Sequence, residues 1–197
     1  MIPIIIDPKT VSMALIGRGE VAGRRLALLD QAGAADLAVF SDAPEPGFAA
    51  AAGRRLRLGL PISDELEAVQ ILWIADLPLD LAKPIAVTAR ARGTIVNVED
   101  VRPYCDFHNP AQVRRGDLLL TVSTNGKSPG LAVRIKRQLA LMFGPEWAGR
   151  VDAIGRKRKA WRRRERPLPE LAQLTNAAID AKSWLPGQRP ANLRLEA

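Results

Sequence analysis

The chain has 197 residues, of which 47% are hydrophobic, and its formal net charge is +8. This length suits one medium α/β domain with a smaller appendage. One cysteine excludes an intramolecular disulfide and a cysteine-rich zinc site, and no apolar run approaches the roughly 18 residues of a membrane helix, so we expect a cytoplasmic protein.

Short apolar segments bounded by turn residues predict the strands along the chain. They are residues 3–7, 12–16, 37–40, 71–75, 94–98 and 118–122, and residues 54–58 are a weaker candidate. Residues 22–29 predict a helix that ends near Gly33, and Pro84 opens a second helix that runs to Arg92. Strands that alternate with helices in this way predict a parallel Rossmann-type sheet in the N-terminal half.

A glycine-rich turn joins the strand at residues 12–16 to the helix that follows. Its sequence, Gly17-Arg18-Gly19-Glu20-Val21-Ala22, has the pattern G-x-G-x-x-A. In a dinucleotide site, Gly17 would permit the tight turn and Gly19 would let the backbone approach a pyrophosphate at the helix N-terminus. A turn with a purely structural role is the alternative that the pattern alone leaves open.

Polar residues directly after the strands are the candidates for a site, because ligands of open α/β sheets bind beyond the carboxyl ends of the strands. Ser41 and Asp42 follow the strand at residues 37–40. An acidic residue there accepts hydrogen bonds from ribose hydroxyls, although Asp42 could equally cap its own loop. Asp76 follows the strand at residues 71–75, and Glu99 and Asp100 follow the next one. Carboxylates in such positions transfer protons, hold a metal or cap a helix.

The C-terminal part begins with a strand, a polar turn and a helix. Ser128 and Pro129 predict the start of this helix. Its apolar stripe predicts a buried face and consists of Leu131, Ile135, Leu139 and Met142. The turn at residues 123–128 lacks the first glycine of a P-loop. Its hydroxyls, Lys127 and the helix N-terminus still predict a general anion site.

Beyond Pro145 the composition predicts a helix that carries a concentrated basic segment. From Arg156 to Arg166 there are eight Lys or Arg residues and one Glu, a local excess of seven positive charges. A solvated helix face explains such a segment, and a nucleic-acid contact surface is the alternative. After a break at residues 167–169, residues 170–185 predict a last helix and residues 186–197 a loosely ordered tail.

Four segments of the chain form a distinctive set. They are the opening Ile-Pro-Ile-Ile-Ile-Asp, the glycine turn, Asn97-Val98-Glu99-Asp100, and Val122 to Ala132. Together they resemble the precorrin-2 dehydrogenase and sirohydrochlorin ferrochelatase family, which also forms the N-terminal module of sirohaem synthases. The resemblance covers about residues 2–185, and its most specific part, Ser123 to Ala132, is similar to the family pattern Ser-(Ser/Thr)-x-Gly-x-Ser-Pro-x-Leu-Ala.

The resemblance implies an α/β fold in three parts. These are a Rossmann-type parallel sheet domain at residues 1–110, a small α+β dimerisation domain at residues 111–143 and a C-terminal helical domain at residues 144–197. It also implies a homodimer that uses NAD to oxidise precorrin-2 to sirohydrochlorin, and some members then insert ferrous iron. Asp100 matches the family's essential aspartate, and we expect it to accept the proton that leaves the macrocycle.

The motifs and the resemblance together give two sets of expected contacts. The cofactor-binding residues are Gly17, Arg18, Gly19, Glu20, Val21, Ser41, Asp42, Ala75 and Asp76. The residues that would hold the carboxylates of the tetrapyrrole are Asn97, Ser123, Thr124, Asn125, Gly126, Lys127, Ser128 and Arg134. We expect no protein-bound metal, because His108 is the only histidine, and we expect no membrane or nucleic-acid partner.

Two departures from the family pattern suggest a further hypothesis. Arg18 stands where the family usually has glycine, so it would either clamp a phosphate or obstruct the cofactor. Asp76 stands where the family tends to have threonine, which changes the contacts to NAD. The alternative function is therefore a non-catalytic paralogue that acts in regulation or binds nucleic acid through its basic segment.

Overall fold

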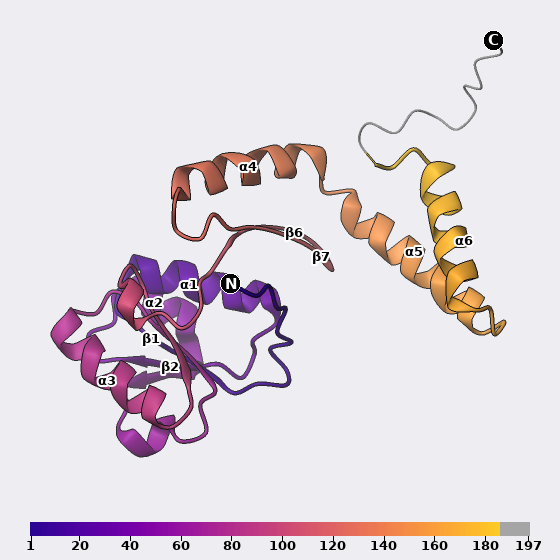
Figure 1. The fold of residues 1–197 in the computed structure, drawn as a ribbon. Helices are drawn as coiled ribbons and strands as arrows, with labels where there is room; N and C mark the ends of the chain where they lie inside the picture. The colour runs from indigo at the N-terminus through magenta and orange to yellow at the C-terminus, as the bar shows by residue number, and fades with distance from the viewer. Residues whose placement is uncertain (186–197) are drawn as a thin grey trace, which may run out of the picture. The chain divides into compact units, whose positions relative to one another are not determined.

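A computed structural model describes residues 1–185 of the chain. The chain divides into two compact units, residues 1–109 and 110–197, which are drawn in Figure 1. The predicted boundary near Phe143 lies inside the second unit, so the division into three domains stays a prediction. Within the described residues, no helix is both long and apolar enough to cross a membrane.

The first unit is built on a five-stranded parallel sheet with the strand order β3-β2-β1-β4-β5. Its strands are β1 (Met13–Ile16), β2 (Ala38–Ser41), β3 (Leu56–Leu58), β4 (Ile71–Ile74) and β5 (Ile95–Val98). Strands β1 and β4 are buried at every position, as expected for central strands covered on both faces. The predicted Rossmann-type sheet is thus confirmed. The strand predicted at residues 3–7 is wrong, because this apolar segment pairs with no strand of the sheet and is mostly exposed.

Helices cover both faces of this sheet (Figure 1). They are α1 (Glu20–Ala32), α2 (Pro46–Ala52) and α3 (Leu79–Ala91), with short 3-10 turns η1 (Gly53–Arg55), η2 (Ser63–Leu66) and η3 (Arg102–Tyr104). Leu26 of α1 and Phe48 of α2 pack with Leu15 and Trp73 on one face. The alanines of α3 pack on the other face against residues such as Leu72.

Two helices of this unit differ from the prediction. Helix α2 was not predicted, because seven residues are too few for a periodic pattern. Helix α3 begins at Leu79 rather than Pro84, which lies inside it. The buried face of α3, formed by Ala82, Ala86 and Ala89, offsets the single backbone hydrogen bond that Pro84 cannot donate. Gly33 ends α1 in a left-handed conformation with φ 89°, as predicted.

In its described part, residues 110–185, the second unit contains an antiparallel hairpin and three helices. They are β6 (Ala111–Arg115), β7 (Leu118–Val122), α4 (Pro129–Met142), α5 (Trp147–Arg162) and α6 (Leu168–Asp180). Figure 1 shows α4 along the hairpin and α6 beside α5. Strand β6 was not predicted, since its sequence Ala-Gln-Val-Arg-Arg has no apolar run. The predicted tail, residues 186–197, lies outside the described residues.

The apolar stripe of α4 is not buried within this chain. Ala132 is the buried residue of the helix, whereas Leu131 is 51% exposed and Ile135 is 38% exposed. The expectation of a buried face is therefore not met within a single chain, where Ala132 is buried, Leu139 is half-buried and the other residues of the stripe are exposed.

Candidate functional site

Four charged residues stand in a row at the carboxyl edge of the parallel sheet. The register aligns Phe40, Ile16, Ile74 and Val98 across the neighbouring strands β2, β1, β4 and β5. Two residues further along each strand come Asp42, Arg18, Asp76 and Asp100. Because this edge is where open α/β sheets bind ligands, the row marks the candidate site.

The glycine turn brings the backbones of β1, α1 and β4 unusually close together. A Cβ atom on Gly17 would lie 2.2 Å from the Cβ of Ala22 and 3.0 Å from the carbonyl oxygen of Ala75. The first contact is shorter than real Cβ atoms show and the second is tighter than most, so this position requires glycine. Ala22 is small for the same reason, which agrees with the helix-packing role of the third motif position.

Arg18 and Asp42 bind one another across the first two positions of the row. The guanidinium donates from Nε at 2.8 Å and from Nη2 at 2.6 Å to the two oxygens of Asp42. This bidentate pair lowers the pKa of Asp42 and raises the pKa of Arg18, and the hydrogen bond between them is the main cause of both shifts. The carboxylate expected to accept ribose hydroxyls is thus held by a residue of the glycine turn.

Asp76 caps the N-terminus of α1 with its carboxylate. Its Oδ2 atom accepts hydrogen bonds from the backbone N–H of Gly19 at 3.2 Å and of Ala22 at 2.8 Å. The residue is partly buried and has a left-handed backbone with φ 56°. An acidic group at this end of a helix is stabilised by the helix dipole and by the free amides. The predicted cofactor contact is therefore also a structural cap.

Glu45 is a further residue of the site that the sequence did not reveal. Its backbone N–H donates to the carbonyl of Arg18 at 2.7 Å, which draws the start of α2 toward the glycine turn. Its Oε1 atom lies 2.7 Å from the place where a Cβ of Gly19 would stand. No motif contains Glu45, so only the folded chain brings it to the turn.

Ser41, the residue before Asp42, is fully buried at the end of β2. Its hydroxyl oxygen has no hydrogen-bond partner among the described residues. The expected contact between its side chain and a cofactor is therefore not supported, since the hydroxyl does not reach the surface.

The two acidic residues after β5 have different surroundings. Glu99 accepts a hydrogen bond from Nη2 of Arg25 on α1 at 2.7 Å, and the arginine side chain is only 11% exposed. Asp100 is exposed, has φ 62°, and its carboxylate forms no hydrogen bond or ion pair within residues 1–185. Only Asp100 therefore offers a free carboxylate at the end of this strand.

Asn97 was expected to contact the substrate, but the fold uses both ends of its amide. Its Nδ2 atom donates to the carbonyl of Phe107 at 2.8 Å, and its Oδ1 atom accepts from Nδ2 of Asn109 at 3.2 Å. Asn109 in turn accepts from the indole Nε1 of Trp73 at 3.1 Å. Asn97 is also only 5% exposed, so its side chain supports the fold, and its contact with the substrate stays a prediction.

The turn at residues 123–128 uses its hydroxyls mainly for its own structure. Ser123 accepts from the N–H of Asn125, and Ser128 caps α4 by accepting from the N–H of Leu131. The hydroxyl of Thr124 donates to the carbonyl of Ser128 and accepts from its backbone N–H. Gly126 has φ 71°, which suits a tight turn. The anion-binding potential of this turn therefore rests on Lys127, which is exposed.

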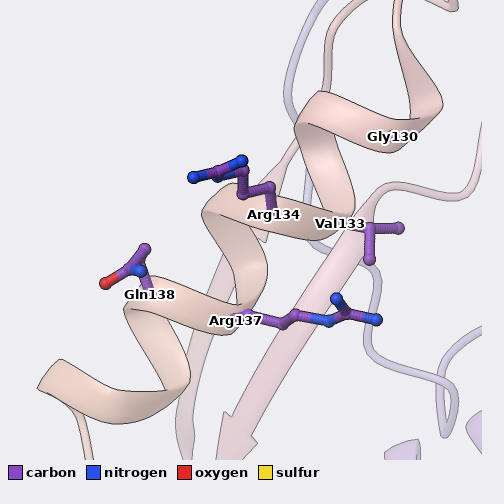
Figure 2. Close-up of a pocket in the computed structure, with 5 residues that line it drawn as sticks. All are labelled: Gly130, Val133, Arg134, Arg137 and Gln138. Atoms are coloured by element: carbon purple, nitrogen blue, oxygen red, sulfur yellow. The ribbon is translucent and has the colours of Figure 1, made fainter.

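Helix α4 carries a surface hollow whose lining residues all lie on this one helix. They are Gly130, Val133, Arg134, Arg137 and Gln138. Figure 2 shows Arg134 and Gln138 extending to one side of the helix and Arg137 to the other. Arg134, an expected substrate contact, is thus an exposed cation of the second unit.

The predicted basic segment lies on α5 and just beyond it. Most of its Lys and Arg residues are exposed, while Trp147 at the start of α5 is buried.

His108 and Cys105 take part in no group of three or more metal-ligating residues within the described chain. Burial raises the pKa of the Cys105 thiol.

The backbone of the glycine turn suits a dinucleotide, but the side chain of Asp76 limits the number of amides that a pyrophosphate can use. The N–H groups of Glu20 and Val21 have no acceptor within residues 1–185 and lie in the first turn of α1. The adjoining amides of Gly19 and Ala22 are taken by Asp76. A pyrophosphate would therefore find two free amides beside a carboxylate.

Two family models match consecutive parts of the chain. A model described as "Putative NAD(P)-binding" matches residues 4–111, and a model described as "Sirohaem biosynthesis protein central" matches residues 115–141. The first match alone includes more than half of the chain.

Curated relatives match most of the chain. A siroheme synthase of Methylococcus capsulatus is 33% identical over 93% of this chain and 42% of its own length. Siroheme synthase 1 of Cronobacter sakazakii is 31% identical over 78% of this chain and 33% of its own length. The chain thus spans less than half the length of these relatives.

A solved structure described as SirC, precorrin-2 dehydrogenase, has a similar fold. The TM-score is 0.75 and the identity is 23%, with 94% of this chain and 93% of that chain covered. At this identity the likeness establishes the shared fold, a parallel sheet unit followed by a hairpin and helices.

Proposed function

Because the chain belongs to the precorrin-2 dehydrogenase and sirohydrochlorin ferrochelatase family, the N-terminal module of sirohaem synthases, we propose that it oxidises precorrin-2 to sirohydrochlorin with NAD. The observation that carries this proposal is the free carboxylate of Asp100 at the ligand-binding edge of the sheet. It lies one strand away from β4, which adjoins the glycine turn.

The backbone of the glycine turn would hold the cofactor. Gly17 keeps strand and helix close, and the N–H groups of Glu20 and Val21 would bind the pyrophosphate at the start of α1. When bound, NAD supplies the acceptor for the hydride that leaves the macrocycle.

Asp100 has the role of general base in this proposal. Oxidation of the macrocycle releases a proton as well as a hydride, and an exposed carboxylate without an internal partner is suited to accept that proton. Glu99 cannot share this role without giving up its ion pair with Arg25. The pairing of Glu99 therefore distinguishes the two neighbouring carboxylates.

Lys127 and Arg134 would bind the acidic side chains of the tetrapyrrole. Both are exposed, and no ion pair within residues 1–185 engages either side chain. Charge-assisted hydrogen bonds from such cations hold carboxylates more strongly than neutral donors do.

A homodimer is part of the proposal, and the exposed stripe of α4 supports it. Large apolar side chains on one exposed helix face are typical of an interaction site. A second copy of α4 would cover Leu131, Ile135 and Met142 and remove them from water.

The nucleic-acid alternative has weaker support. It rests on the exposure of the basic segment of α5, which a solvated helix face explains equally well. The curated relatives reported above are siroheme synthases, and this favours the enzyme. Steep salt dependence of DNA binding would be required to revive the alternative.

The test is anaerobic incubation of the purified protein with precorrin-2, with and without NAD, while absorbance records sirohydrochlorin. We expect NAD-dependent product, and we expect Asp100→Asn to reduce turnover at least about a hundredfold, because a general base typically contributes that much or more. Addition of ferrous iron to the product then tests metal insertion, in which Asp100 would accept the displaced pyrrole protons.

Glu99→Gln provides the matched control for this experiment. Like Asp100→Asn, it removes one negative charge, but the carboxylate that it replaces is the one paired with Arg25. The free carboxylate of Asp100 stays in place. We expect Glu99→Gln to lower the melting temperature and to retain turnover. Normal turnover by Asp100→Asn, or equal losses in the two variants, would contradict the assignment of Asp100.

A further inference from the structure

The start of α1 already holds an anion that belongs to the chain itself. The Oδ2 atom of Asp76 accepts from the amides of Gly19 and Ala22, whereas Gly19, at the N-cap, has no side chain to cap the helix. The helix dipole favours one negative group at this end, and the free amides bind it. The carboxylate of Asp76 thus occupies two amides of the helix end at which a pyrophosphate would bind.

A second carboxylate adds to the negative charge at the turn. The side chain of Glu45 lies against Gly19, at the place where a Cβ atom would stand on any other residue. In a dinucleotide site, the missing Cβ of this glycine lets the pyrophosphate approach the backbone. The nearby cation, Arg18, is engaged in its bidentate pair with Asp42. The carboxylates of Asp76 and Glu45 therefore both lie at Gly19, and the guanidinium of Arg18 is bound to a third carboxylate, that of Asp42.

We propose that Asp76 competes with the cofactor pyrophosphate for the N-terminus of α1 and so sets the affinity of this chain for NAD. The inference rests on the proposed function, because it takes NAD as the cofactor. Like charges that share one helix end repel each other, so the cofactor binds with reduced affinity or displaces Asp76 from its two amides. Glu45 contributes less, because its side chain is exposed and can turn away.

The backbone at Asp76 determines which variants test this proposal. Its φ of 56° is tolerated by asparagine and glycine but strained for most other residues. Asp76→Asn removes the charge and keeps an oxygen that can cap α1. Asp76→Gly removes the side chain and frees both amides without backbone strain.

The chain also contains a closely matched control. Asp100 occupies the corresponding position after the neighbouring strand β5 and has φ 62°, but it accepts no hydrogen bond from α1. Asp100→Asn therefore makes the same charge change in the same backbone conformation at the same edge of the sheet. A general gain from removing negative charge would appear in this variant as well.

The experiment is isothermal titration of NAD into the full chain without tetrapyrrole, with circular dichroism to confirm folding of each variant. We expect Asp76→Asn to lower the Kd about tenfold, or about 1.4 kcal/mol, and Asp76→Gly to lower it at least as much. Asp100→Asn should stay within about twofold of the wild type, because it leaves the α1 amides unchanged.

The outcomes separate this inference from the proposed function. Unchanged or weaker NAD binding by both Asp76 variants overturns the inference, as does an equal gain in Asp100→Asn. NAD binding that appears only in the Asp76 variants supports it. Failure of the proposed function is seen in a different measurement, the absence of precorrin-2 oxidation by protein that has bound NAD. A lack of NAD binding in every variant overturns both.

Discussion

Replacement of Gly17 by alanine tests the close approach of β1, α1 and β4 at the glycine turn. The new Cβ would lie 2.2 Å from the Cβ of Ala22, whereas carbon atoms in contact are separated by roughly 3.5 to 4.0 Å. The backbone must therefore shift by about an ångström or more in a closely packed region. We expect a loss of unfolding free energy of about 2 to 3 kcal/mol, at the upper part of the usual range for overpacking.

A second substitution shows whether this clash is the cause. Ala22→Gly removes the opposing methyl group and alone costs about 1 to 2 kcal/mol through helix propensity and lost burial. In the double variant the remaining short contact is the 3.0 Å approach to the carbonyl of Ala75. We therefore expect the double variant to be about 1 to 2 kcal/mol more stable than additivity predicts.

Urea denaturation of the four proteins measures this coupling. Trp73 is buried in the first unit and reports its unfolding by fluorescence. The tryptophans of the second unit would be replaced by phenylalanine in all four proteins, namely Trp147, Trp161 and Trp184. Full stability of Gly17→Ala, or strict additivity in the double variant, would refute the steric explanation.

Two further predictions concern the Arg18 to Asp42 pair and the stripe of α4. The folded pKa of Asp42 is depressed, so the pair stabilises the fold above the unfolded pKa of about 3.9 and loses this effect as pH falls through the folded value. Asp42→Asn should thus lower Tm at neutral pH and lower it less at a pH below the folded pKa of Asp42. An equal difference in Tm between variant and wild type at the two pH values would contradict this. If the proposed dimer forms through this stripe, we expect analytical ultracentrifugation to give a dimer mass for the wild type and a monomer mass for Ile135→Glu, with Lys136→Glu as the control. An unchanged mass of Ile135→Glu would argue against the stripe as the contact.

The sheet and its glycine turn could be predicted from the sequence because their signals are local. Apolar runs gave the strands of the sheet, and the small residues at positions 17, 19 and 22 marked the turn between β1 and α1. Residues 3–7 show the limit of such reasoning. Their isoleucines have the propensity for a strand, but a strand also needs a neighbour to pair with, and the sequence does not reveal one.

The positions of the residues at the carboxyl edge of the sheet could be predicted from the sequence, but the contacts between these residues could not. Each follows a strand, and this is visible in the sequence. That Asp76 caps α1 and that Arg18 holds Asp42 depends on residues 54 and 24 positions apart in the chain. Glu45 reaches Gly19 through a helix too short to be predicted. The competition at the helix end therefore becomes visible only in the folded chain.

The amide network around Asn97 determines where the first unit can be separated from the rest of the chain. Asn109 is the last residue of that unit and links the indole of Trp73 to Asn97. Phe107, two residues earlier, packs edge-on against the same indole, with ring centroids 5.3 Å apart. A fragment that stops a few residues early would leave buried polar groups unpaired and uncover the indole. Any excised nucleotide-binding unit should therefore extend through Asn109, eleven residues beyond the last strand of its sheet.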